Sequence, residues 1–236
     1  MPGVGDELRA DNANWSFGGD VSEHFDEHVQ RSVPFYRAGH ELVTHATDFF
    51  LPNGSLLYEL GCSTGSLLTR LAARHRRKDV RIVGIDREPE MVARAREKCA
   101  GHPNVEVIEG DILEVPLENA DVIIAYYTVQ FVLPRVRQQL IDRIYQSLNW
   151  GGAFFLFEKV RGPDARFQDM LNALYTEYKL EQGYQSEEIV AKMRSLKGVL
   201  EPFSSEGNLG LLQRAGFTDI TTVFKYICFE GFLAIK

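Results

Sequence analysis

Cysteine is scarce in this chain and is not arranged for disulfide or metal chemistry. The three cysteines among the 236 residues, Cys62, Cys99 and Cys228, lie far apart and form no Cys-x-x-Cys or Cys/His pair. A disulfide framework or a zinc site is therefore not expected, and scattered thiols are typical of a reducing cytoplasm. His24 and His28 share one face of a predicted helix, but no third ligand accompanies them, and we expect no metal.

Long apolar runs and an excess of basic residues are also missing. No hydrophobic stretch reaches the length that spans a membrane, and residues 1–14 lack the basic-then-apolar pattern of a signal peptide. The net charge of −7 argues against a surface built to neutralise nucleic-acid phosphates. We expect a cytoplasmic protein with a small-molecule partner and without direct nucleic-acid or membrane contacts, and a homodimer stays open.

Short apolar runs that alternate with helical segments organise most of the chain. The composition, with 44% hydrophobic and 25% charged residues, is that of a globular domain. Runs rich in Val and Ile, each followed by a helix, indicate βαβ units and a parallel sheet in an α/β fold. The predicted strands are 55–59, 80–85, 105–109, 120–126 and 153–158, and the predicted helices are 65–76, 89–100, 134–148 and 206–215.

The C-terminal end predicts a different kind of strand pair. Extended runs at 218–227 and 232–236 are joined at Phe229-Glu230-Gly231, which reads as the turn of an antiparallel hairpin. This hairpin brings the predicted sheet to seven strands, most of them parallel. Trp150-Gly151-Gly152 is expected to be the turn that leads into the fifth strand.

Three segments lie outside this regular pattern. Residues 1–20 are rich in Gly, Asp and Asn and are expected to be flexible, and helices at 21–31 and 35–50 follow as an N-terminal helical cap. Residues 164–200 interrupt the alternation with charged, helical sequence and predict a lid. Apart from its first twenty residues, we expect the chain to form a single domain, 21–236.

A glycine-containing turn joins the first predicted strand to its helix. Its sequence is Glu59-Leu60-Gly61-Cys62-Ser63-Thr64-Gly65. Glycines at this place let the backbone approach a ligand, and the free amides of a helix N-terminus attract polar groups. The segment lacks the G-x-G-x-x-G pattern of dinucleotide sites and a Walker lysine, so these two ligand classes fit poorly.

Acidic residues follow the next two predicted strands. Asp86 ends the second strand, at the place where a carboxylate accepts hydrogen bonds from ribose hydroxyls. Gly110-Asp111-Ile112 follows the third strand, where a carboxylate beside an apolar side chain suits an adenine ring. Because the carboxyl ends of parallel strands meet at one edge of a sheet, these motifs together predict one nucleoside-binding crevice.

This series of motifs resembles class I S-adenosylmethionine (SAM)-dependent methyltransferases, with Ser63 where the common pattern has glycine. Within that superfamily, residues 20–236 are similar to the carboxy-S-adenosylmethionine synthase family. The resemblance implies a Rossmann-like fold that binds SAM as substrate or cosubstrate in one catalytic domain. The matching pieces include Gln30-Arg31-Ser32-Val33-Pro34, Leu60-Gly61-Cys62-Ser63, Thr128-Val129-Gln130-Phe131, Gly183-Tyr184 and Ala215-Gly216-Phe217.

The resemblance also implies which residues meet each end of SAM. That family carboxylates SAM with prephenate and holds the added carboxylate with an arginine, where this chain has Met193. Arg194 follows one residue later, about 100° around a helix, and Tyr126 stands where the family has asparagine. The residues expected to bind SAM are Tyr36, Glu59, Gly61, Cys62, Ser63, Gly65, Asp86, Arg87, Asp111, Ile112 and Tyr126.

Tyrosines are expected around the reactive end of SAM, because an aromatic face stabilises a sulfonium cation without an anion. We expect Tyr175 to be the first catalytic contact and Tyr126 the second, with Met193 and Arg194 nearby. A tyrosine-lined pocket under a lid suits a reaction of SAM alone, closure to azetidine-2-carboxylate with release of methylthioadenosine. Methylation of a small acceptor, carboxy-SAM synthesis and a non-catalytic SAM-binding scaffold stay as alternatives.

Overall fold

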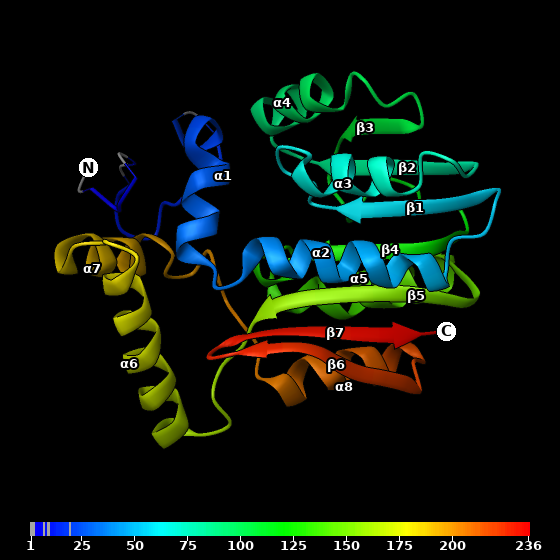
Figure 1. The fold of residues 1–236 in the computed structure, drawn as a ribbon. Coiled ribbons are helices and arrows are strands. Elements are labelled where there is room, and N and C mark those ends of the chain that lie inside the picture. The colour runs from blue at the N-terminus through cyan, green and yellow to red at the C-terminus, as the bar shows by residue number, and fades with distance from the viewer. Residues whose placement is uncertain (1–2, 7, 9, 19) are drawn as a thin grey trace.

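A seven-stranded sheet forms the centre of the protein (Figure 1). The computed structural model describes residues 3–236 apart from 7, 9 and 19. The strand order is β3-β2-β1-β4-β5-β7-β6; the first five strands are parallel, and β7 runs antiparallel to both β5 and β6. The strands are β1 Ser55–Leu60, β2 Val80–Asp86, β3 Val105–Glu109, β4 Ala120–Tyr126, β5 Leu148–Lys159, β6 Asp219–Tyr226 and β7 Phe229–Ile235.

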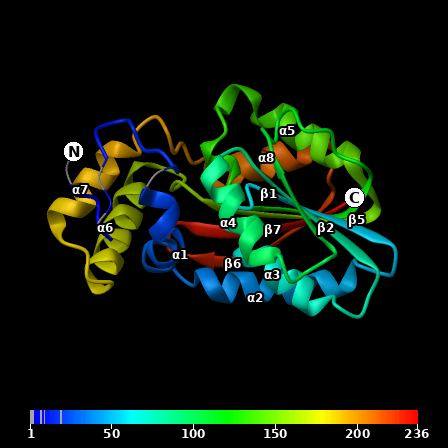
Figure 2. The ribbon, with the colours of Figure 1, turned by 90° about the horizontal axis from the view of Figure 1, so that it is seen from above.

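Helices cover both faces of this sheet (Figure 2). α2 and α3 pack on one face with α4 beside α3, whereas α5 and α8 pack together on the other. Within the part of the chain that the structure describes, no helix is long and apolar enough to cross a bilayer. The helices are α1 Asp20–Ser32, α2 Tyr36–Ala46, α3 Ser66–Arg74, α4 Pro89–Cys99, α5 Pro134–Ser147, α6 Ala165–Glu181, α7 Ser186–Ser195 and α8 Ser205–Ala215, with 3-10 turns at Thr47–Phe49 and Val129–Phe131.

The phenylalanines of β5 connect the two layers of the core. Successive side chains of a strand point to opposite faces of a sheet. Phe154 therefore packs in the cluster beneath α5 and α8, and Phe155 and Phe157 pack in the cluster beneath α2 and α3. All three are fully buried, so the carboxyl end of β5, which borders the site described below, is held from both sides.

The sequence-based α/β fold is confirmed, with two local corrections. β5 begins at Leu148, so residues 150–152 belong to the strand and are not a turn before it. The hairpin turns at Ile227 and Cys228, because Tyr226 pairs with Phe229. Ile227 adopts the left-handed backbone (φ 48°) that tight hairpins require. A β-branched residue gives no sequence signal for this conformation.

Apolar side chains anchor part of the N-terminal segment. Val4, Leu8 and Trp15 are buried and form a cluster with Met91 of α4. The ring of Phe17 lies 4.8 Å from that of Phe131, centroid to centroid. The predicted flexibility of residues 1–20 stays a prediction, but these contacts attach the segment to the domain.

The predicted lid folds as the two helices α6 and α7, which are separated at Gly183 and Tyr184. Gly183 has the positive φ of 86° that allows the sharp change of direction. Together with α1, these helices lie beyond the carboxyl ends of β1, β4 and β5 (Figures 1 and 2). The N-terminal cap and the insertion are therefore neighbours, although about 140 residues separate them in the chain, as in the contact of Ser32 with Tyr175.

Replacing Phe155 by alanine tests the role of β5 in the core. The free energy of unfolding should fall by about 3–5 kcal/mol, because the change removes a fully buried ring and leaves a cavity. Denaturant unfolding followed by circular dichroism measures the change. Thr221→Ala on the exposed side of β6 is the matched control, and a Phe155→Ala protein as stable as this control would contradict the described core.

Candidate active site

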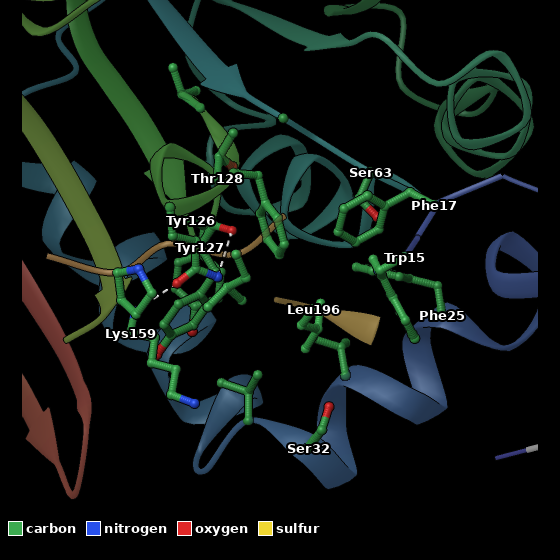
Figure 3. A pocket seen from close by; sticks show the side chains of 18 of the residues that line it. Trp15, Phe17, Phe25, Ser32, Ser63, Tyr126, Tyr127, Thr128, Lys159 and Leu196 are labelled. Carbon is green, nitrogen blue, oxygen red and sulfur yellow. Dashed lines mark hydrogen bonds between the residues drawn. The ribbon is translucent and has the colours of Figure 1, made fainter. Parts of the chain in front are cut away.

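A pocket of about 580 Å³ opens where the strand order reverses between β1 and β4. This size is in the range of sites for cofactor-sized ligands. Its walls come from the loops after β1 to β5, from α1 and from the lid. Figure 3 shows Trp15, Phe17 and Phe25 on one side of the pocket, and Tyr126 and Lys159 on the other.

Three residues with left-handed backbone, Gly61, Ser63 and Gly65, shape the turn after β1. Gly61 (φ 72°) has no room for a side chain, because a methyl group there would lie 2.4 Å from the Thr128 side chain. Ser63 (φ 51°) adopts the conformation that explains the glycine of the common pattern, and its amide donates to Asp86 Oδ2 at 2.8 Å. Such strained residues cluster at ligand sites, where surrounding contacts hold them in place.

Asp86 lies at the wall of the pocket and organises the loops around it. Its Oδ1 accepts the amide of Glu88 at 3.0 Å, and its Oδ2 accepts that of Ser63. Burial raises the pKa of Asp86, and these amide hydrogen bonds oppose the rise. Each carboxylate oxygen keeps a further lone pair that could accept a ribose hydroxyl.

Asp111 and Ile112 border the same end of the pocket, at the loop after β3. Asp111 Oδ1 accepts the amide of Leu113 at 2.8 Å, which fixes the loop. Ile112 is buried and contributes an apolar surface on which a planar ring can pack. Arg87 also lines the pocket. The donors, acceptors and apolar surface expected for a nucleoside are therefore present together.

Glu59 lines the pocket and has a carboxylate oxygen with no hydrogen-bond partner among the described residues. The residue is buried at the end of β1, and its Oε2 has no hydrogen bond within the described part of the chain. Burial, followed by the charge of Asp86, raises the pKa of Glu59 well above its usual range. A buried group of this kind is stabilised when a ligand meets it, which supports the fit of a polar ligand such as the aminocarboxypropyl part of SAM.

Three tyrosines line the wall between the core and α2. Tyr126 Oη donates to the carbonyl of Tyr36 at 2.8 Å, and the two ring centroids are 5.2 Å apart. Gly39 makes this contact possible, because a methyl group there would lie 2.1 Å from the Tyr126 hydroxyl. Tyr127, with a left-handed backbone (φ 60°), packs 4.8 Å from Tyr126. Tyr126 thus lines the pocket, and its hydroxyl is already used in the hydrogen bond to Tyr36.

Tyr175 reaches the pocket from α6 and also joins the lid to the N-terminal cap. Its hydroxyl donates to the carbonyl of Ser32 at 2.7 Å. The Nζ atoms of Lys159 and Lys179 lie 4.4 Å and 4.8 Å from the centroid of its ring. The ring was predicted to face a sulfonium, whereas in the structure two lysines already contact it.

Most of the expected site residues surround the pocket, but two do not. Gly65 caps the start of α3 and packs against Ala95 and Cys99, because its positive φ turns the chain away from the pocket. Arg194 lies on the exposed side of α7, one residue and about 100° from Met193. Those that line the pocket are Tyr36, Glu59, Gly61, Cys62, Ser63, Asp86, Arg87, Asp111, Ile112, Tyr126, Tyr175 and Met193, of which Met193 is 65% exposed.

Four lysines that the sequence did not predict line the pocket, namely Lys159 at the end of β5, Lys179 on α6, Lys192 on α7 and Lys197 after α7. Lys179 and Lys192 are buried, which is rare for lysine. The lid sequence is charged throughout, so a buried lysine within it is not distinguishable by composition. One feature of the sequence did indicate a role for Lys179. It follows Tyr175 by four residues, so the two side chains lie on the same face of the helix.

Hydrogen bonds to Asp6 connect the N-terminal segment to α1 and the lid. His28 Nδ1 donates to Asp6 Oδ2 at 2.5 Å, and the hydroxyl of Tyr184 donates to the same oxygen at 2.5 Å. Arg31 forms an ion pair with Asp6 and donates to the carbonyl of Gln182 at 2.8 Å. Although burial opposes it, these contacts lower the pKa of Asp6 to about 2, so the carboxylate stays charged and holds the segments together.

Comparisons with known proteins bear on the family and the fold of the chain. Residues 57–152 match the family model described as a methyltransferase domain. The chain is 38% identical over 223 residues to the carboxy-S-adenosyl-L-methionine synthase of Campylobacter lari, covering 94% of each chain. The fold resembles that of the SAM-dependent methyltransferase SibL in its apo form (TM-score 0.65, 16% identity, 99% of this chain and 64% of that one). It also resembles human N-acetylserotonin methyltransferase in complex with SAM (TM-score 0.58, 20% identity, 94% and 60%).

The strand order, the glycine turn and the acidic residues after β2 and β3 define a SAM-dependent enzyme with the class I methyltransferase fold. This class is the one that the sequence predicted. Within it, the extent of the match to carboxy-S-adenosyl-L-methionine synthases shows that the chain belongs to their family.

Replacing Asp86 by alanine should weaken SAM binding by roughly 1–3 kcal/mol, the usual effect of losing a hydrogen bond to a charged group. Isothermal titration calorimetry with SAM measures the loss, and thermal unfolding of the ligand-free variant checks that the loop after β2 remains folded. Glu106→Ala, an exposed acidic residue of β3 outside the pocket, is the control. An unchanged affinity of the Asp86→Ala protein would remove Asp86 from the ribose site.

Proposed function

We propose that the enzyme acts on SAM alone and closes its aminocarboxypropyl chain to azetidine-2-carboxylate, with release of methylthioadenosine. The proposal rests mainly on what α7 contributes to the pocket. The family resemblance implies an arginine that grips an added carboxylate, but Met193 stands there and Arg194 does not line the pocket. Losing a guanidinium removes the two-pronged contact that a carboxylate prefers. The residues at the nucleoside end, in contrast, are those expected for SAM.

The aromatic wall and the lid of the pocket support an intramolecular closure of SAM. The chain must be folded so that its amine faces the γ-carbon, the amine must be unprotonated, and water must be excluded. Tyr126 and Tyr127 form a rigid aromatic wall at the end of β4, and the lid closes over it through the bond from Tyr175 to Ser32. No second substrate is needed for this reaction.

Carboxy-SAM synthesis is the second candidate, and two observations favour it. The chain belongs to the family whose relatives carry that name. Lys159, Lys179 and Lys192 also place amines at the pocket, and an ammonium can bind a carboxylate as a point charge where arginine is missing.

Incubation with SAM alone, followed by mass analysis of the products, separates these functions. Methylthioadenosine and azetidine-2-carboxylate in equal amounts are expected. Carboxy-SAM that forms only after prephenate is added would support the second candidate instead. S-adenosylhomocysteine that forms only with added cell extract would indicate methylation of an acceptor, and unchanged SAM in every sample would indicate a non-catalytic protein.

Substitutions of Tyr175 test its contribution to closure of the lid. Tyr175→Phe removes one hydrogen bond, to Ser32, and should reduce turnover of SAM about 2–10-fold, in line with the net 0.5–1.5 kcal/mol of such a bond. Tyr175→Ala also removes the ring that Lys159 and Lys179 contact and should reduce turnover much further. Steady-state release of methylthioadenosine gives both values.

Tyr178 provides the matched control for these variants. Its ring stacks on Tyr175 at 6.3 Å, but the residue does not line the pocket. Tyr178→Phe should therefore leave turnover close to that of the unaltered enzyme. If both Tyr175 variants also react at the unaltered rate, Tyr175 is a structural residue only.

A further inference from the structure

Lys159 and Lys179 approach one aromatic ring from different elements. Lys159 extends from the end of β5 into the pocket (Figure 3), and Lys179 lies one helical turn after Tyr175 on α6. Both Nζ atoms lie within 5 Å of the Tyr175 ring centroid, at 4.4 Å and 4.8 Å. Within the described part of the chain, neither Nζ forms a hydrogen bond or an ion pair.

Two neighbouring ammonium groups without an anion are an unfavourable arrangement in a buried place. Removing a charge from water without a partner costs several kcal/mol, and a titratable group then loses its charge instead. Lys179 is buried, whereas Lys159 is partly buried. Burial lowers the pKa of both lysines, that of Lys179 to about 7, so near neutral pH a large part of Lys179 is a neutral amine whose lone pair can accept a proton.

We infer that Lys179 is a catalytic residue that accepts the proton of the SAM α-ammonium, and that Lys159 is a positioning residue that keeps it neutral. The inference rests on the proposed cyclisation and identifies the base for that reaction. The base belongs to the lid, so it meets SAM only when the lid is in place.

The groups around Lys179 support this role. Burial is the main cause that lowers the pKa of Lys179 to about 7, and the charge of Lys159 lowers it further. Cys228, between β6 and β7, is the described group that opposes the shift, but burial raises the pKa of its own thiol, which is therefore neutral. From the other side, Lys192 and His28 face Lys179, and neither side chain carries a negative charge, so neither supplies a counter-ion.

Tyr175 completes the site, because its ring stabilises the cation that Lys179 becomes after it accepts the proton. A base is most effective when its pKa lies near the working pH, as the pKa of Lys179 does. Lys179 is thus able to accept a proton in the substrate complex and to release it to solvent when the product leaves.

The proposed step conserves atoms and charge. One N–H bond of the SAM ammonium breaks, and its proton binds to Lys179 Nζ. The amine lone pair forms the nitrogen–γ-carbon bond, the γ-carbon–sulfur bond breaks, and its electron pair stays on sulfur. SAM with one net positive charge thereby gives neutral methylthioadenosine, zwitterionic azetidine-2-carboxylate and a protonated Lys179.

The experiment measures methylthioadenosine release from SAM as a function of pH for Lys179→Met and Lys179→Arg. Both should lose about 100-fold or more in kcat near neutral pH, the range for removal of a general base, with little change in KM. Arginine keeps the positive charge but cannot become neutral at these pH values. At high pH, solvent deprotonates the SAM amine without help, so the defect should become smaller, which a misfolded variant would not show.

Lys159→Met tests the electrostatic part of the inference. The reaction needs neutral Lys179, so the rate of the unaltered enzyme should rise as the pH increases through a midpoint near 7. Without the charge of Lys159 the pKa of Lys179 rises, and this midpoint should move to higher pH. Glu177→Met, an exposed change on the same helix, is the control and should keep the unaltered profile.

The other outcomes overturn the inference in distinguishable ways. If the unaltered enzyme releases methylthioadenosine and Lys179→Arg does so equally well, Lys179 acts as a cation that binds a carboxylate. An unaltered pH profile in Lys179→Met would show that another group accepts the proton. If the unaltered enzyme releases no methylthioadenosine from SAM, the proposed function itself is wrong, and the role of Lys179 as its base fails with it.

Discussion

Because β1 and β4 are neighbours in the sheet but are followed by helices on opposite faces, the loops after them must separate. This constraint opens the pocket, and the rest of the structure depends on it. One end of the pocket is formed by the loops after β1 to β3, which carry the glycine turn, Asp86 and Asp111. The other end is formed by the ends of β4 and β5, which carry Tyr126 and Lys159. A ligand that lies along this edge of the sheet contacts the residues after β1 to β3 with one part and the residues after β4 and β5 with the other.

The sheet alone leaves the reactive end uncovered, and two segments from distant parts of the chain cover it. α1 is fixed to the core through Asp26, which accepts hydrogen bonds from Thr64 at 2.7 Å and from Lys98 at 2.6 Å. The lid is in turn fixed to α1 through Tyr175 and Ser32. The N-terminal cap therefore holds the lid in place. The positions of the lid lysines depend in this way on the N-terminal half of the chain.

Sequence periodicity and turn residues predicted almost the whole core, because each strand is a short apolar run between clear breaks. The pocket residues after β1 to β3 were predictable for the same reason, since they lie directly at strand ends. The lysines of the pocket were not, because Lys159, Lys179 and Lys192 come from three separate elements and meet only through the packing of the lid. The turn at Ile227 escaped prediction because a β-branched residue rarely adopts a positive φ.

The hydrogen bonds of Asp6, Arg31 and Tyr175 join the N-terminal segment, α1 and the lid into one cover. A cover held in this way does not open by the movement of a single loop, because breaking one bond leaves the others in place. The lid and the N-terminal segments therefore separate only when several bonds break together, and local openings of this size are slow compared with the motion of side chains.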